Sequence, residues 1–180
     1  MVGAGGAAPV AGDRDGAVPG AGAPGGRDSG ESMAWIVVRV RGGIHSRHDI
    51  QQTLRELHLT RANHATVVPE EPSFRGMLMA TQGYVTWGEA EAETVQVLLA
   101  ARGETRTGVR LSAPKEGTPP VAELATSVLG GGLARVKTLK PLVRLTPPKG
   151  GWKSTKKPYS LGGALGYRGR AINDLVKKMI

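Results

Sequence analysis

The residues with the clearest chemical potential lie near the C-terminus, where basic residues alternate with aromatic residues and glycines. Lysine and arginine bind phosphates and release counterions, and aromatic rings stack on unpaired bases. Glycine lets backbone N–H groups approach a phosphate closely, because it has no side chain that would clash. This pattern predicts contact with a nucleic acid through Lys149, Lys153, Lys156, Lys157, Arg168 and Arg170, interspersed with Trp152, Tyr159 and Tyr167.

The positive charge of the chain is concentrated in the same region. The net charge is +9, and residues 135–180 contain 12 Lys and Arg but a single acid, Asp174. Charge segregated to this degree favours a polyanionic partner. A solvated loop with scattered lysines is the open alternative, because many charged runs simply lie in solvent. Within this region the segment 144–170 is the part expected to contact nucleic acid.

A second group of basic residues follows the first predicted strand. It lies in a loop and in the first turn of a helix, and consists of Arg41, His45, Arg47 and His48. Backbone N–H groups at the start of a helix attract phosphate, so basic side chains beside them would extend an anion-binding surface. Helix capping and ordinary exposure explain the same residues equally well, and both interpretations stay open.

The sequence contains no convincing catalytic or metal-binding motif. Cysteine is absent, which excludes disulfides, thiol nucleophiles and cysteine-based zinc sites. His45 and His48 are three residues apart, but neither an HExxH motif nor a cysteine supports a metal site there. The acids Glu89, Glu91 and Glu93 are explained by the positive end of a helix dipole. We therefore expect no enzymatic activity, no cofactor, no metal and no small-molecule substrate.

The first 32 residues differ in composition from the rest of the chain. Gly, Ala and Pro supply 20 of these 32 positions, so the segment lacks the apolar periodicity that would offset the entropy of ordering. Two interpretations stay open: a disordered leader, or an upstream segment that is not native because the natural start is Met33. The sequence shows neither a membrane span nor a secretory signal, and we expect a cytoplasmic protein.

Strands and helices are predicted to alternate from residue 34 onward. β-Branched runs and helical apolar spacing indicate, in order, strand 34–40, helix 47–58, strand 65–68, helix 73–82 and strand 84–87. Leu54 lies on the apolar face of the first helix, and Ser46 with Asp49 resembles a capping box at its start. Pro72 suits the first turn of the second helix, because its missing N–H costs nothing there.

The pattern continues more loosely toward the C-terminus. It indicates helix 89–102, helix 118–130, strand 141–148, loop 149–170 and helix 170–179. Thr86 and Glu89 have the spacing of a capping box for the first of these helices. Thr118 is the expected cap of the next helix, with Pro119 at its first position. The last helix is expected to pack back onto the core through one apolar face.

This alternation predicts an α/β (α+β) sandwich in which one small antiparallel sheet carries helices against one face. The expected organisation is a leader at 1–32, a βαβαβ RNA-binding core at 33–88, a helical extension at 89–140, and a basic strand-loop-helix extension at 141–180.

Several motifs together resemble one known family, the L-thirty family of large-subunit ribosomal proteins (L-seven in eukaryotes), in its archaeal form. They occur in the family's order and cover nearly all of 33–180: MAWIVVRVRG (33–42), DIQQTLRELHLTRANHATVVPEEPSFRGML (49–78), YVTWGE (84–89), RLTPPKGGW (144–152) and GGALGYRGRAINDLVKKMI (162–180). Two parts depart from the family: the first 32 residues have no counterpart in it, and 103–140 are only loosely similar.

The resemblance implies a ferredoxin-like βαβαβ core, a longer archaeal extension, and binding to large-subunit ribosomal RNA without catalysis. Carried over by motif, the implied RNA-binding residues are Arg41, His45, Arg47, His48, Arg61, Asn63, His64, Arg75, Gly76, Met77, Arg144, Lys149, Gly150, Lys153, Tyr167, Arg168 and Arg170. Lys156 and Lys157 join them from the charge pattern alone.

The expected partners are therefore large-subunit ribosomal RNA and neighbouring ribosomal proteins, and whether 5S RNA is reached stays open. A free-standing basic nucleic-acid-binding protein, of the RNA-chaperone or chromatin type, would use the same charges and is the alternative.

Overall fold

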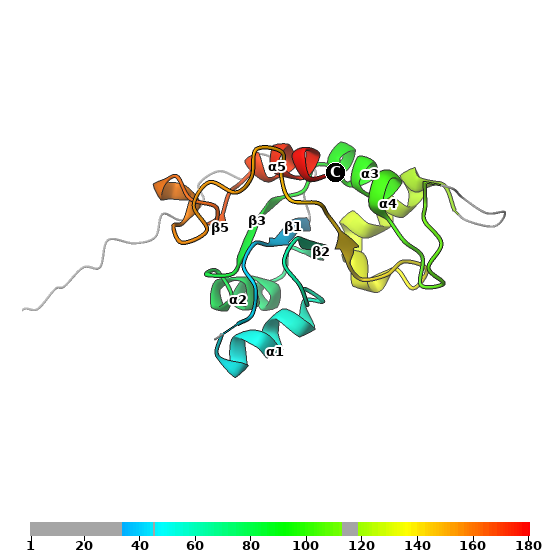
Figure 1. The fold of residues 1–180 in the computed structure, drawn as a ribbon. Helices are drawn as coiled ribbons and strands as arrows, with labels where there is room; N and C mark the ends of the chain where they lie inside the picture. The colour runs from blue at the N-terminus through cyan, green and yellow to red at the C-terminus, as the bar shows by residue number, and fades with distance from the viewer. Residues whose placement is uncertain (1–33, 45, 113–118) are drawn as a thin grey trace, which may run out of the picture. The chain divides into compact units, whose positions relative to one another are not determined.

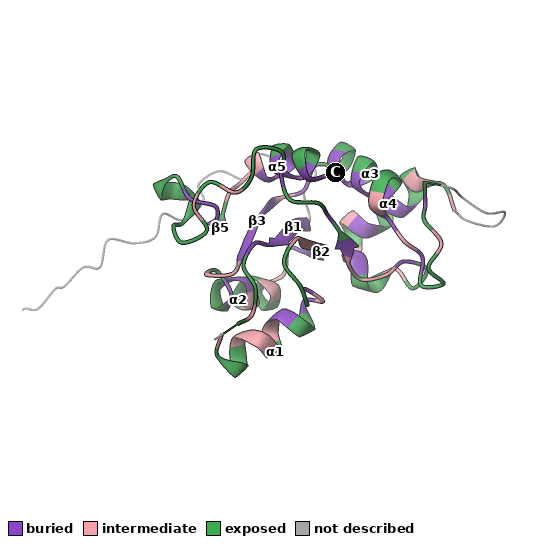
Figure 2. Cartoon of the chain, viewed as in Figure 1, coloured by how far each residue is buried: buried purple, intermediate pink, exposed green. Residues whose placement is uncertain are grey.

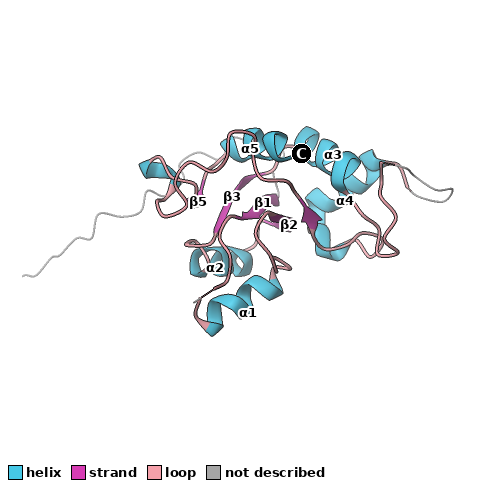
Figure 3. Cartoon of the chain, in the orientation of Figure 1, coloured by secondary structure: helices cyan, strands magenta, loops and turns pink. Residues whose placement is uncertain are grey.

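A computed structural model describes residues 34–44, 46–112 and 119–180. Its centre is a five-stranded sheet of order β4-β2-β1-β3-β5 (Figure 3). The strands are β1 (Ala34–Arg39), β2 (His64–Pro69), β3 (Val85–Glu89), β4 (Val143–Arg144) and β5 (Gly166–Tyr167). His45, Met33 and the first 32 residues, about which predictions were made above, lie outside the described residues.

The sheet combines the predicted antiparallel core with one parallel edge. β1 pairs antiparallel with both β2 and β3, and β2 pairs antiparallel with β4. β5 runs parallel to β3, with Thr86 opposite Gly166 and Trp87 opposite Tyr167. The mixed α/β class and the ferredoxin-like order of the first five elements are confirmed. The predicted strand 141–148 is shorter than expected, because only two of its residues pair with β2.

Helices cover both faces of the sheet, so the prediction of helices against one face was wrong. α1 (His48–Glu56) and α2 (Pro72–Ala80) cover one face, while α3 (Ala92–Arg102), α4 (Val121–Gly131) and α5 (Ala171–Met179) cover the other (Figure 1). The reason lies in β1, whose two alternating sets of side chains are both apolar: Ile36 packs on one side and Val37 on the other. A strand without a polar face needs cover on both sides.

The two cores are visible as buried segments above and below the sheet (Figure 2). One contains both strand tryptophans, Trp35 and Trp87, together with Leu54 of α1 and Leu78 of α2. The other is larger and draws on three helices and on β4. The predicted packing of the C-terminal helix onto the core is confirmed, since Ile172, Leu175, Val176 and Met179 are buried there.

Both predicted capping boxes are absent. Arg47 is the N-cap of α1 without a side-chain hydrogen bond, and the Ser46 hydroxyl donates to the carbonyl of Gly43 at 2.7 Å instead. Thr86 lies inside β3, because that strand continues to Glu89 through its pairing with β1, and its hydroxyl donates to the Gly166 carbonyl at 2.9 Å. The start of α3 is capped from a distance: Asn173 Oδ1 accepts the Glu91 N–H at 3.2 Å.

Prolines set the starts of two helices, with one difference from expectation. Pro72 occupies the first turn of α2, as predicted. α4 begins at Val121, and its N-cap is Pro120, so Pro119 is not its first residue. Thr118, the expected cap, lies outside the described residues. Two short 3₁₀ turns, η1 (Leu133–Arg135) and η2 (Tyr159–Leu161), complete the fold.

Replacing Leu54 by Ala is expected to lower the free energy of unfolding by about 2–5 kcal/mol, because a buried leucine leaves a cavity in a close-packed core. Leu54 is 1% exposed between α1 and the sheet. Urea unfolding followed by circular dichroism measures the change. Gln52→Ala at an exposed position of the same helix is the control and should shift the value by less than about 0.5 kcal/mol. Equal effects of the two variants would contradict this packing.

Candidate nucleic-acid interface

The antiparallel sheet gathers basic residues from distant parts of the chain at one end. β1 ends where β2 and β3 begin, and the same end holds the close of β4 and the start of β5. Arg41, Arg61, His64 and Arg144 therefore lie around one end of the sheet, which we call the basic end. Each of these residues was predicted from the sequence to bind RNA, but their common location follows from strand pairing.

A long loop crosses over the basic end. Residues 145–165, called the crossing loop below, leave β4 at one edge of the sheet and rejoin it through β5 at the other. On the way the loop packs against the end of β1, where Val40, Ala164 and Leu165 form a small buried cluster with Trp152 against it. The crossing loop therefore contacts the residue that directly precedes the loop after β1.

Backbone contacts give the crossing loop a defined path. The Lys149 N–H donates to the Lys178 carbonyl at the end of α5 at 3.1 Å, and the Ala164 N–H donates to the Ser154 carbonyl at 2.8 Å. Gly163 lies so close to the backbone of Lys157 that a Cβ atom there would collide with its carbonyl group. The loop is therefore held by its own backbone, which leaves its lysine side chains available.

Those lysines are exposed. Lys149, Lys153, Lys156 and Lys157 all lie at the surface of the crossing loop, and Gly150 between them adopts a left-handed backbone with φ of +87°. That conformation favours glycine, because a Cβ atom would be strained there. No salt bridge to these lysines occurs within the described residues, so their charges are not neutralised by neighbouring acids.

His64 lies among positive charges at the basic end. It pairs with Arg144 across β2 and β4, and Arg61 is three residues before it. Partial burial, followed by the charges of Arg144, Arg61 and Arg39, lowers the pKa of His64 below its usual value of 6.5. The imidazole is therefore mainly neutral near pH 7, where it accepts or donates a hydrogen bond without adding charge.

Asn63 shapes the backbone next to this cluster. Its φ of +62° is left-handed, a conformation that Asn tolerates better than most residues. Its N–H donates to the Arg39 carbonyl at 2.8 Å, and its carbonyl accepts the Leu145 N–H at 3.0 Å. Asn63 therefore ties together β1, β2 and the start of the crossing loop. Its Oδ1 atom is buried and has no hydrogen-bond partner among the described residues.

The residues after β1 form the other side of the basic end. The Arg41 guanidinium lies over the Tyr84 ring at 5.4 Å, a cation–π contact that leaves the side chain exposed. Arg47 pairs with Asp49 at 3.0 Å, but both side chains are highly exposed, and such a pair contributes little. His48, the first residue of α1, is also exposed.

The predicted residues on α2 lie apart from this surface. α2 follows the far end of β2, so its first turn begins at the opposite end of the sheet. Arg75 and Gly76 are exposed there. Met77 is partly buried and packs against the core beneath α2, together with Phe74, so a packing role accounts for it.

The Arg168 guanidinium makes intramolecular contacts that stabilise the crossing loop, so it is not free to bind a phosphate. Its Nη2 donates to the Ala164 carbonyl at 3.1 Å and its Nε to the Thr86 hydroxyl at 3.3 Å. Its guanidinium also lies over the Tyr159 ring at 4.4 Å. Burial lowers the pKa of Arg168, yet arginine keeps its charge near pH 7. These contacts close the crossing loop against β3 and η2.

Tyr167 and Arg170 both contact the Glu89 carboxylate, at the end of the sheet opposite the basic end. The Tyr167 hydroxyl donates to Glu89 Oε1 at 3.1 Å, and Arg170 Nε lies 3.6 Å from Glu89 Oε2. Burial, then the hydrogen bond and charge of Glu89, raise the pKa of the Tyr167 phenol. Both residues were predicted to face RNA, and the structure separates them from the crossing-loop lysines.

Sequence reasoning overlooked Arg39, which organises the basic end from inside. Its Nη1 donates to the carbonyls of Leu59 at 2.6 Å and Thr60 at 2.9 Å, and its Nε to that of Arg41 at 2.9 Å. Burial lowers its pKa. The available signal was its place within the apolar run AWIVVRV, where a buried position requires a charged side chain to find backbone partners.

Metal-binding clusters of three or more His, Cys, Asp or Glu side chains do not occur in the described part of the chain. In the same part, every helix is too short or too polar to cross a membrane.

Comparison with known proteins agrees with this architecture. The sequence profile of a family described as ribosomal protein L30p/L7e matches residues 35–85. A Methanopyrus kandleri protein named large ribosomal subunit protein uL30 is 45% identical over 149 residues, covering 78% of this chain and 100% of that protein. Proteins of the same name from Methanococcus maripaludis and Methanosphaera stadtmanae are 43% and 40% identical, covering 82% and 81% of this chain and 100% and 99% of theirs.

The chain belongs to the ribosomal protein L30p/L7e family. The resemblance seen in the motifs, including its archaeal form, is confirmed, since these relatives come from archaea. Membership in a family of structural ribosomal proteins also confirms that the chain is not an enzyme. The matched residues 35–85 run from β1 to the first residue of β3, and all of the crossing-loop lysines lie beyond them.

Replacing Arg144 by Gln is expected to raise the pKa of His64, because one of the positive charges that disfavour the imidazolium is removed. Burial remains, so the pKa should stay below 6.5. Because folding lowers this pKa, the folded state binds fewer protons, and His64 destabilises the fold as the pH falls below about 6.5. NMR titration of the His64 ring measures the shift. Arg106→Gln serves as the control, because Arg106 is exposed and is not among the charges that lower the pKa of His64. An unchanged pKa of His64 in Arg144→Gln would contradict the proposed influence of Arg144.

Proposed function

We propose that this protein is a structural constituent of the large ribosomal subunit and binds its ribosomal RNA through the basic end and the crossing loop. The observation that carries the proposal is geometric. Strand pairing places Arg41, Arg61 and Arg144 at the same sheet end that the lysine-bearing loop crosses. A cationic surface on a rigid frame suits recognition of folded RNA by shape and phosphate positions. The names of the relatives support the ribosomal assignment.

Different residues would serve this binding in different ways. The residues proposed to contact RNA at this surface are Arg41, Arg47, His48, Arg61, His64, Arg144, Lys149, Gly150, Lys153, Lys156 and Lys157. Asn63 and Arg168 would act by holding the backbone that presents them. Arg75, Gly76, Tyr167 and Arg170 lie elsewhere, so we propose that they meet another RNA segment or a neighbouring ribosomal protein.

The protein is expected to sediment with large ribosomal subunits from cytoplasmic extract in low salt and to dissociate as the salt concentration rises, because phosphate contacts release counterions. Competition between ribosomal RNA and duplex DNA at fixed salt distinguishes this function from that of a general nucleic-acid-binding protein. A protein found free of ribosomal particles, or one displaced equally well by DNA, would refute the proposal. Cross-linking mapped by residue then identifies the RNA contacts and shows whether 5S RNA is among them.

Replacing Lys153, Lys156 and Lys157 together by Ala is expected to weaken RNA binding and to flatten its salt dependence, by roughly 0.7–0.9 in the log–log slope for each lost phosphate contact. The matched control replaces Arg106, Arg110 and Lys137 by Ala. This variant also loses three positive charges, but from exposed positions in the region after α3. Filter binding at several salt concentrations measures both slopes. If both variants show the same loss of RNA affinity and the same decrease in the salt-dependence slope, the effect comes from net charge alone. The lysines of the crossing loop would then not be specific RNA contacts.

A further inference from the structure

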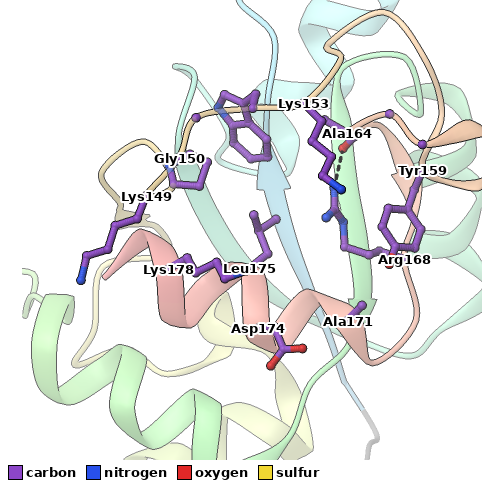
Figure 4. Close-up of a pocket in the computed structure, with 15 residues that line it drawn as sticks. Lys149, Gly150, Lys153, Tyr159, Ala164, Arg168, Ala171, Asp174, Leu175 and Lys178 are labelled. Carbon is purple, nitrogen blue, oxygen red and sulfur yellow. Dashed lines mark hydrogen bonds between the residues drawn. The ribbon is translucent and has the colours of Figure 1, made fainter.

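A recess lies between the crossing loop and α5. Its volume is about 360 Å³, which is within the range for sites that hold a small organic group. Residues 148–153 of the crossing loop form one side of the recess, and α5 forms its bottom (Figure 4). The other side consists of Tyr159, residues 162–164 and Arg168.

The recess combines an apolar interior with a cationic rim. Leu175 points into it from α5 and is 8% exposed, and Ala164 on the loop side of the recess is also buried (Figure 4). Trp152 lines the recess and is partly buried against both neighbouring hydrophobic clusters. An aromatic ring near an aliphatic side chain offers a flat apolar surface on which a base can lie.

Basic residues line the recess. Lys153 of the crossing loop points toward Arg168, whose guanidinium lies in the wall beside Tyr159, while Lys149 and Lys178 lie at the outer edge and the Lys149 side chain extends away from the recess (Figure 4). Asp174 is the one acid among the lining residues. Binding to phosphates alone would need only exposed lysines on a convex surface. An apolar hollow ringed by lysines suits a group that has both a flat ring and phosphates.

We propose that this recess receives one unpaired nucleotide of the bound RNA. Its base would lie against Trp152 and Leu175, and its flanking phosphates would meet the lysines of the rim. Asp174 at the edge could accept a hydrogen bond from an amino group of the base or from a ribose hydroxyl. The proposal rests on the RNA-binding function above and adds to it a preference for RNA that presents an unstacked base.

Two short RNA hairpins test it, one with a single unpaired 2-aminopurine nucleotide and one fully paired but otherwise identical. The full chain is expected to bind the first about tenfold more tightly (~1.4 kcal/mol), within the range for stacking of one base on an aromatic ring. The fluorescence of 2-aminopurine should change when the base enters the recess. Equal affinity for the two hairpins would overturn the proposal while leaving general RNA binding intact.

A variant that fills the recess without changing the net charge tests whether the preference for an unpaired nucleotide arises in the recess. Ala171 lines the recess at the start of α5, and Ala171→Phe should abolish the preference for the unpaired nucleotide while affinity for the paired hairpin stays unchanged. Ala101→Phe on the exposed side of α3 is the control and should keep the preference. Thermal unfolding verifies that both variants fold.

The same hairpins separate this inference from the proposed function. A preference that persists in Ala171→Phe would place the base elsewhere and overturn the site. Displacement of the hairpin by micromolar mononucleotide would show a small-molecule site and overturn it as well. Failure of the unaltered protein to bind either hairpin or ribosomal RNA would instead refute the RNA-binding function itself.

Discussion

The burial of β1 on both faces is the constraint on which the rest of the structure depends. Every residue from Ala34 to Arg39 is buried, and successive side chains point into two different cores. The helices that lie between the first three strands cover only one of these cores. The other requires α3, α4 and α5, so the segments after β3 complete the hydrophobic interior as well as carrying charge. Exposing this face would leave Ile36 and Val38 in water, at a cost of several kcal/mol.

The two-sided core also fixes where the charged loops lie. α5 returns along the sheet, and its last turn accepts the crossing loop through the carbonyls of Lys178 and Met179. The far end of the loop is tied to β3, because Arg168 donates both to the Ala164 carbonyl of the loop and to the Thr86 hydroxyl of β3. The lysines between these anchors stand on a path set by backbone hydrogen bonds. In the function proposed above, such fixed placement would favour recognition of RNA shape over binding to any polyanion.

Residues of the same type take different roles according to their neighbours. Arg144 is exposed at the basic end, Arg168 supports the loop from within, and Arg170 is paired with Glu89. The charge of the chain therefore overstates the number of cations that are available to a phosphate. Arg39 is a further example, because its guanidinium is used by three backbone carbonyls. Only the tertiary contacts distinguish these cases.

The sequence alone determined the order of elements, the helical face bearing Leu54, the apolar face of α5 and the concentration of charge after residue 135, because local periodicity and composition carry this information. It did not determine that helices cover both faces, that β5 joins the sheet in parallel, or that Thr86 bonds Gly166 instead of capping α3. Asn173 caps that helix from a segment far along the chain. The gathering of Arg41, His64, Arg144 and the crossing loop was likewise decided only in three dimensions, since strand pairing sets which loops share an end of the sheet.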